Sequence, residues 1–120
     1  MSKVVINLAT GLEDPERVMA AFLVGHAATT KGRQVAMFLT KDAVHLAVPG
    51  NATGAACDEC PPLERLFAQY TEGGGELLVC PICMASREVE ESQLVAGARP
   101  AGATPLWEWI GDEPATVFSY

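Results

Sequence analysis

Residues Glu76 to Val89 read Glu-Leu-Leu-Val-Cys-Pro-Ile-Cys-Met-Ala-Ser-Arg-Glu-Val, and this stretch decides the fold. Its apolar start, Leu77 to Val79, predicts a short buried strand, and Met84 to Val89 predicts the opening of a helix. Between them, Cys-Pro-Ile-Cys at positions 80–83 stands at a strand-to-helix junction. Proline is favoured in a first helical turn, where no backbone N–H is needed. The pattern therefore predicts that both cysteines lie at the start of a helix.

A cysteine at the start of a helix is a candidate nucleophile. Backbone N–H groups are unpaired there and the helix dipole is positive, so a thiolate is stabilised. If the helix starts at Pro81, the spacing i, i+3, i+7 places Cys80, Cys83 and Arg87 on one helix face. Arg87 would then add positive charge beside the sulfur atoms. We therefore expect a catalytic site formed by these three residues.

The bulk properties restrict the class of protein. The chain has 120 residues, 49% of them hydrophobic, which predicts a single domain spanning 1–120. Its 15 acidic and 8 basic residues give a net charge of −7. This charge disfavours nucleic acids and anionic membranes as partners, because both bind clustered lysine and arginine. No stretch is long and apolar enough for a membrane span, and the N-terminus lacks the pattern of a signal peptide, so we expect a cytoplasmic protein. In that compartment four cysteines in two C-x-x-C pairs indicate metal or redox chemistry rather than structural disulfides.

Strands and helices are predicted to alternate along the chain. Short apolar runs are typical of strands covered on both faces, and apolar residues at intervals of three and four are typical of helices. The expected strands are 4–8, 34–39, 77–79, 93–98 and 115–120, and the expected helices are 15–30, 43–48, 63–70, the one starting at 81, and 104–110. This order is typical of an α/β protein with a mostly parallel sheet between helices. Because functional groups gather at the carboxyl ends of parallel strands, the loops 9–14 and 40–42 should meet the Cys80 turn at one edge.

A metal site is the main alternative to a nucleophilic site. The second pair is Cys57 and Cys60, and the 19 residues Pro61 to Val79 separate it from the first. This gap fits a zinc module in which Cys57, Cys60, Cys80 and Cys83 bind the metal without catalysis. Against it, the residues between the pairs predict a full helix and a buried strand, whereas zinc ribbons consist of small β-hairpins. A small-ligand or oligomer scaffold with inert cysteines is the third interpretation.

Two segments resemble the DsrE/DsrF-like family of small sulfur-relay proteins, which includes the TusD type. They are Met-Phe-Leu-Thr-Lys-Asp-Ala-Val at 37–44 and, above all, Val-Cys-Pro-Ile-Cys-Met-Ala-Ser-Arg at 79–87. By position, Cys80 matches the sulfur-carrying cysteine of the TusD type, and Cys83 matches a second cysteine that part of the family carries. Members usually have a glycine after the arginine, where this chain has Glu88.

The resemblance implies both a fold and a function. The implied fold is a three-layer α/β/α domain around a five-stranded parallel sheet. The implied function is intracellular sulfur relay, with the chain as a sulfurtransferase or persulfide carrier on Cys80 and Cys83 assisting or resolving. Such transfer requires no cofactor, whereas the metal alternative requires zinc.

The resemblance also implies partners. These are sulfur donor and acceptor proteins, and further copies of the chain, because family members commonly form homotrimers or hexamers with the cysteine near subunit contacts. Trp107, Trp109 and Phe118 are the candidate contact residues, although aromatic side chains are more often buried in the core.

Overall fold

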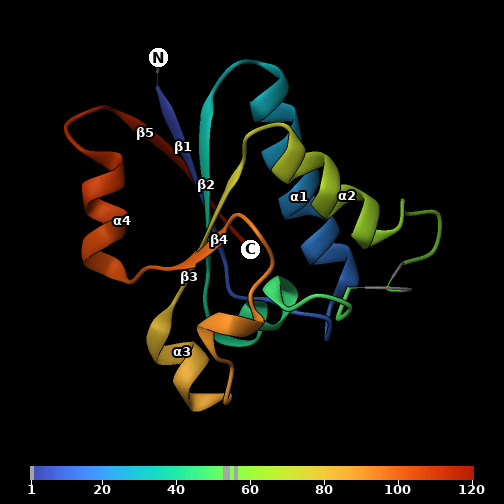
Figure 1. Cartoon of the computed structure of the whole chain (residues 1–120). Helices are drawn as coiled ribbons and strands as arrows, with labels where there is room; N and C mark the ends of the chain where they lie inside the picture. Colours follow the sequence, from blue (N-terminus) through green and yellow to red (C-terminus); the bar gives the residue numbers. More distant parts are fainter. Residues whose placement is uncertain (1, 53–54, 56) are drawn as a thin grey trace.

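The computed structural model describes residues 2–52, 55 and 57–120, which form a five-stranded sheet in the order β4-β3-β2-β1-β5 (Figure 1). All the strand pairs are parallel. The strands are β1 (Lys3–Leu8), β2 (Gln34–Leu39), β3 (Glu76–Val79), β4 (Ala98–Pro100) and β5 (Ala115–Ser119). The α-helices are α1 (Pro15–Thr30), α2 (Leu63–Glu72), α3 (Pro81–Ser86) and α4 (Ala103–Ile110), and the 3-10 helices are η1 (Lys41–Ala47) and η2 (Glu91–Gln93).

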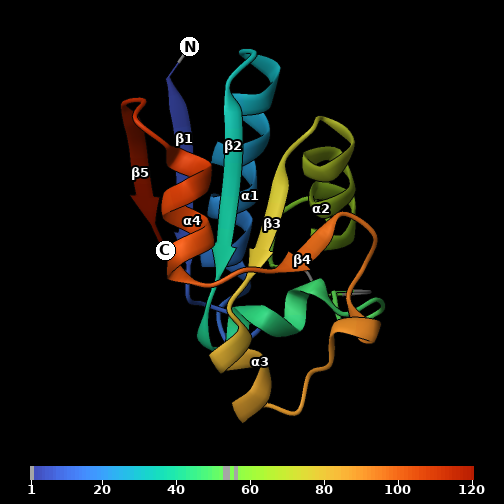
Figure 2. The same ribbon diagram turned by 60° about the vertical axis from the view of Figure 1, so that its left-hand side comes forward.

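Helices cover both faces of the sheet, which confirms the predicted three-layer α/β/α architecture. The helices α1 and α2 lie side by side on one face and α4 lies on the other, while α3 and η1 lie below the carboxyl ends of the strands (Figures 1 and 2). The larger core lies under α1 and α2, where the ring of Phe22 packs 5.5 Å from that of Phe67 and 5.6 Å from that of Tyr70. This core fixes the strands on which the cysteine loop is built.

The turn from α2 into β3 requires a glycine. The Tyr70 hydroxyl donates a hydrogen bond of 2.7 Å to the carbonyl of Glu76, so the ring lies across the turn. A β-carbon on Gly75 would lie 2.3 Å from that ring, closer than real contacts allow. Burial raises the pKa of the Tyr70 hydroxyl above its usual range, so this donor keeps its proton. The turn thereby sets the residue at which β3 begins.

Polar contacts hold α4 against the second face. The indole Nε1 of Trp109 donates to Glu76 Oε2 at 2.6 Å, and Arg99 donates to the other oxygen of the same carboxylate at 2.8 Å. The Lys3 ammonium donates to the carbonyl of Trp109, lies 5.1 Å from the centre of its ring, and pairs with Glu113 at 3.1 Å. The buried apolar cluster on this face contains Ala36, Leu78 and Ala101.

The predicted fourth strand, 93–98, is wrong, because β4 spans Ala98–Pro100. A capping box between Glu90 and Gln93 turns the chain into η2, with the backbone N–H of Glu90 bonded to Gln93 Oε1 at 2.8 Å. The N–H of Val95 then donates to the carbonyl of Ala47 at 2.8 Å. This segment therefore crosses over η1 and joins the sheet later than its apolar pattern indicated.

Apolar side chains remain exposed on α4 and on the edge strand β5. Trp107 is 70% exposed on α4, whereas Trp109 is half-buried against the sheet. On β5, Val117 is 59% exposed and Phe118 is 38% exposed. Core packing therefore accounts for Trp109 but leaves Trp107 and Phe118 available for contacts. No helix in the described part of the chain is long and apolar enough to cross a membrane.

Candidate functional site

Cys80 is the residue at which β3 ends and α3 begins. Its backbone N–H donates to the carbonyl of Leu39 in β2 at 3.0 Å, which completes the pairing of the two strands. Its own carbonyl accepts a hydrogen bond of 3.0 Å from the N–H of Met84, which makes Cys80 the N-cap of α3. The predicted strand-to-helix junction is confirmed. The helix expected over Met84 to Val89 is wrong beyond Ser86, because α3 spans only Pro81–Ser86 and Arg87 is its C-cap rather than a residue of its face.

Both thiols of the first pair are free and half-buried. Cys83 packs against the main core, and Met84 beside it is buried. Between the two cysteines the side chain of Ile82 is 81% exposed. The thiols therefore lie at the boundary between core and solvent, on a segment that an external reactant can approach.

Arg87 binds the end of α3 to η1. Its Nε lies 2.8 Å from Asp42 Oδ1, and one terminal nitrogen donates to Ser86 Oγ at 3.1 Å and to the carbonyl of Cys83 at 3.4 Å. The hydrogen bond from Arg87 holds the pKa of Asp42 below its ordinary value of 3.8. Sequence analysis did not find Asp42 as this partner, although Asp42 lies within the family-like segment 37–44.

The loops predicted to share one edge of the sheet do meet there. The N–H of Thr40 donates to the carbonyl of Leu8 at 3.0 Å, so β1 and β2 end together. A β-carbon on Gly11 would lie 2.7 Å from the backbone oxygen of Asp42, so the first loop touches η1 through a residue that must be small. Through Asp42, the same η1 holds α3, and three strand exits thus support the cysteine segment.

Glu88 occupies a left-handed backbone conformation, with a φ of 56°. It follows Arg87, the C-cap of α3, at the position where glycine commonly ends a helix because it lacks a β-carbon. The structure therefore gives a physical reason for the glycine that family members usually carry there. In this chain the left-handed turn is kept with a strained glutamate.

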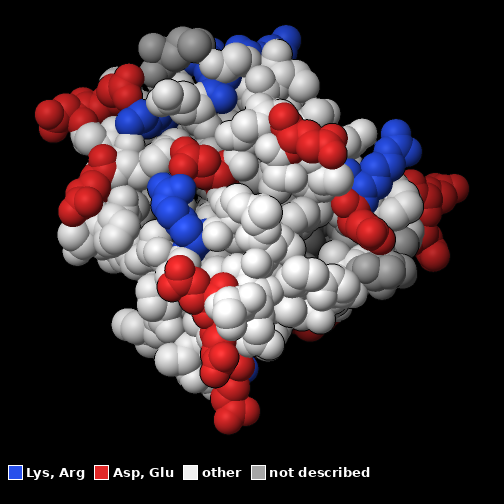
Figure 3. Space-filling model, viewed as in Figure 1, with Lys and Arg blue, Asp and Glu red and all other residues white. Residues whose placement is uncertain are grey.

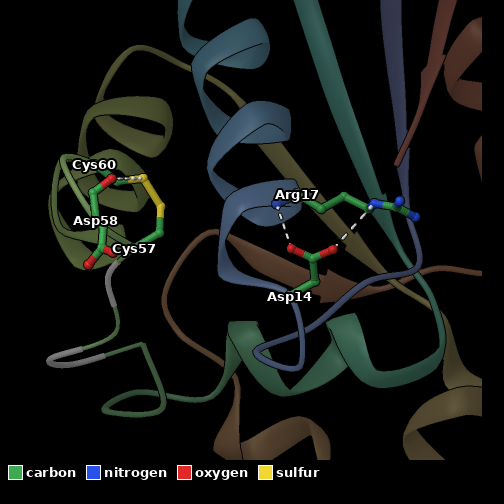
Figure 4. The surroundings of a disulfide bond; sticks show 5 residues. All are labelled: Asp14, Arg17, Cys57, Asp58 and Cys60. Atoms are coloured by element: carbon green, nitrogen blue, oxygen red, sulfur yellow. Dashed lines mark hydrogen bonds and ion pairs between the residues drawn. A yellow bond between two sulfur atoms is a disulfide. The ribbon is translucent and has the colours of Figure 1, made fainter.

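The second cysteine pair forms a disulfide bond between Cys57 and Cys60 (Figure 4). The pair lies in a tight turn just before α2, with the Cys60 N–H bonded to the Cys57 carbonyl at 3.1 Å. Because it closes only a two-residue turn, the bond restrains the unfolded chain little and is a weak structural staple.

The four-cysteine zinc site is not assembled in the part of the chain that the structure describes. There, no group of three or more His, Cys, Asp or Glu side chains is arranged to hold a metal ion. Cys57 and Cys60 are bonded to each other at the start of α2, and Cys80 and Cys83 lie on α3. The metal alternative therefore has no support in this geometry.

Comparison with known proteins identifies the family. The model of the DsrE/DsrF-like family matches residues 2–118. The chain belongs to this family. The uncharacterized protein MK0008 of Methanopyrus kandleri is 28% identical over 103 residues, which cover 86% of this chain and 82% of that protein.

Two solved structures resemble this DsrE/DsrF-like protein over nearly their whole length. The YchN protein of E. coli has a TM-score of 0.80 at 18% identity, with 100% of both chains covered. MTH1491 of Methanobacterium thermoautotrophicum, a protein of unknown function, has a TM-score of 0.73 at 9% identity, covering 98% of this chain and 99% of its own. Membership indicates sulfur relay at the level of the family, and these structural likenesses show the fold.

The ion pair between Arg87 and Asp42 should stabilise the folded protein in a pH-dependent manner. Because the pKa of Asp42 is lowered on folding, this stabilisation is present above pH 3.8 and is lost as the pH falls through the folded-state pKa. The substitution Asp42→Asn should lower the midpoint of thermal unfolding at pH 7. The difference from the parent should disappear once the pH is below the folded-state pKa of Asp42.

A matched control is Asp112→Asn, which removes the same charge from the exposed turn between α4 and β5. Circular dichroism melts at several pH values should show little change for this variant. An Asp42→Asn difference that persists unchanged in acid would contradict the assigned ion pair.

Relief of the left-handed turn should stabilise the protein. A left-handed L-residue costs roughly 1–2 kcal/mol, and the greater freedom of an unfolded glycine offsets about 0.5–1 kcal/mol of that. Glu88→Gly should therefore raise the free energy of unfolding, measured by urea titration, by about 0.5–1 kcal/mol. Glu88→Ala removes the same carboxylate but keeps the β-carbon, so an equal gain in that variant would show that charge, not backbone conformation, is responsible.

Proposed function

We propose that this DsrE/DsrF-like protein carries sulfur as a persulfide on Cys80, with Cys83 and Arg87 completing the site. The observation that carries the proposal is a free, half-buried cysteine that caps α3 at the carboxyl edge of a parallel sheet. Functional groups of such sheets gather at this edge. Membership in a sulfur-relay family supports the same assignment.

Loading of Cys80 is an exchange between sulfur atoms. The Cys80 thiolate attacks the outer sulfur of a donor persulfide, and a new S–S bond forms at Cys80 as the S–S bond of the donor breaks. The outer sulfur keeps its proton, and the donor leaves as a thiolate. An acceptor thiolate reverses these steps on the Cys80 persulfide, so relay requires no cofactor and no net oxidation.

Cys83 is proposed to assist or resolve. Its thiolate can attack the inner sulfur of the Cys80 persulfide, which forms a Cys80–Cys83 disulfide and releases hydrosulfide. A dithiol reductant would then restore both thiols. Arg87 is proposed to keep α3 in place through Asp42 during these steps, because its guanidinium also bonds to the carbonyl of Cys83.

The assignment to Cys80 is tested by loading with glutathione persulfide. We expect intact mass under denaturing conditions to show a gain of one sulfur atom in Cys83→Ser. The parent should show that gain or the loss of two hydrogen atoms that marks the Cys80–Cys83 disulfide, and reductant should reverse either change. Cys80→Ser should show only the background of an unreactive protein. Equal loading of Cys80→Ser and the parent would contradict the assignment of Cys80 as the sulfur carrier. Peptide mapping would then locate the reactive thiol.

The protein is further proposed to act as a homotrimer or hexamer, with sulfur donor and acceptor proteins as partners. The family resemblance and the exposed apolar residues Trp107, Val117 and Phe118 support this. The strand β5 contains no charged residue, and unprotected edge strands tend to pair with another chain. Sedimentation velocity should therefore give three or six times the chain mass, and Phe118→Asp should shift the protein toward smaller species. A monomer at micromolar concentration would contradict this proposal.

A further inference from the structure

The disulfide bond between Cys57 and Cys60 takes no part in the function proposed above. Cys80 and Cys83 are free thiols at α3, whereas this pair lies just before α2 and is already oxidised (Figure 4). As a staple the bond adds little stability, because it closes a turn of only two residues. A bond that contributes little to folding can open without unfolding the protein, so the pair is a candidate for reversible redox chemistry.

Backbone contacts hold the turn independently of the disulfide bond. The Cys60 N–H donates to the Cys57 carbonyl at 3.1 Å, and the Leu63 N–H donates to the Ala55 carbonyl at 3.1 Å. Leu63 itself is buried in the main core. The α-carbons of the two cysteines lie 5.1 Å apart, within the range of about 4.4–6.8 Å that disulfide bonds span. Reduction therefore leaves both thiols close enough for the bond to form again.

The turn can be reached from solvent and accommodates the reduced state. Both cysteines are half-buried, and the two residues between them, Asp58 and Glu59, are exposed. The carbonyl oxygen of Asp58 lies 3.5 Å from Cys60 Sγ. After reduction, the Cys60 thiol can donate a hydrogen bond to this oxygen. The same turn thus suits both oxidation states of the pair.

Negative charge predominates around the turn. Residues 57–65 contain three acidic and one basic side chain, all exposed, and they are Asp58, Glu59, Glu64 and Arg65. In the described part of the chain, none of the three carboxylates forms an ion pair. Asp14 and Arg17, drawn beside the disulfide in Figure 4, pair with each other at 3.8 Å and add no net charge.

The surface shows the same excess of negative charge. Acidic side chains gather at the right-hand edge of Figure 3, around the start of α2, and a basic side chain lies among them. A reductant that attacks this turn brings an anionic thiolate toward these carboxylates. Positive charge around the attacking thiolate would offset the repulsion and speed the encounter, whereas further negative charge would slow it.

We propose that Cys57 and Cys60 form a second, redox-active site, which is reduced by a dithiol protein whose reactive cysteines are flanked by lysine or arginine. A thiolate of the partner attacks one sulfur atom of the disulfide, so the Cys57–Cys60 bond breaks and a mixed disulfide forms. The displaced sulfur leaves as a thiolate and takes up a proton. The second thiolate of the partner then attacks the mixed disulfide, which leaves Cys57 and Cys60 as thiols and the partner as a disulfide. Two electrons and two protons pass to this chain.

Three dithiol peptides test the proposal on the full chain, in which Cys80→Ser and Cys83→Ser remove the other thiols. The peptides share one C-x-x-C sequence, flanked by lysine, glutamine or glutamate residues. Aliquots are quenched with excess N-ethylmaleimide, and the thiols are counted from the intact mass. Each rate is divided by the rate of the same peptide with bis(2-hydroxyethyl) disulfide, an uncharged substrate, which corrects for differences in thiol reactivity. If the double serine variant does not fold, peptide mapping of the alkylated parent gives the same readout.

The lysine peptide should reduce the bond about tenfold faster than the glutamate peptide at low ionic strength, with the glutamine peptide between them. The ratio should shrink in about 0.5 M salt, which screens exposed charges. Asp58→Asn combined with Glu59→Gln should remove most of the ratio, and glutamine keeps the β-carbon at the left-handed φ of 62° that Glu59 adopts. The matched control is Glu108→Gln with Asp112→Asn, which removes two exposed carboxylates on and after α4 and should leave the ratio unchanged.

Reversal of the reaction and retention of the fold complete the test. Oxidised glutathione should restore the bond, and circular dichroism melts should change little on reduction. A disulfide that opens only in denaturant, or a reduced protein that is unfolded, would show an inert staple and overturn the redox site. Equal corrected rates for the three peptides, or an equal loss of the ratio in the control variant, would overturn the positively charged partner. Neither result bears on sulfur transfer at Cys80, which has its own test.

Discussion

Parallel pairing between β2 and β3 is the constraint on which the site depends. The register pairs Leu39 with Val79, so both strands leave the sheet at the same level. The hydrogen bond from the Cys80 N–H to the Leu39 carbonyl then fixes the first residue beyond the ladder. Shifting this register would move Cys80 away from η1, and the capping of α3 would no longer coincide with the exit of β2. The placement of Cys80 thus depends on a backbone contact that involves no sulfur atom.

The cysteine segment is held by the loops that follow β1 and β2 as well as by the main core. Gly11 lies against the backbone of Asp42, and Asp42 holds Arg87 at the end of α3. These contacts join the exits of β1, β2 and β3, which are far apart in sequence. The support leaves the outer side of α3 to solvent, where Ile82 is exposed. The cysteine segment is therefore held on one side and open to solvent on the other.

The two faces of the sheet are stabilised in different ways. Under α1 and α2 the contacts are apolar and extensive, whereas α4 is held largely through the carboxylate of Glu76 and the ammonium of Lys3. Glu76 also begins β3, and its carbonyl accepts the Tyr70 hydroxyl. One residue at the start of β3 therefore connects both layers. On the α4 side, Trp107 remains exposed.

Local patterns by themselves determined most of the fold and singled out Cys80 and Cys83 as the candidate pair. The strand-to-helix junction at Cys80 depends on neighbours in the chain, and it was predicted correctly. Tertiary structure helped to decide the position of β4, because the contact of Val95 with η1 adds to the local capping box of Glu90 and Gln93 in competing with strand formation. It also decided the pairing of Arg87 with Asp42, 45 residues away, and the exposure of Ile82. Contacts between distant segments depend on how the layers pack, and this packing cannot be predicted from the local periodicity of the sequence.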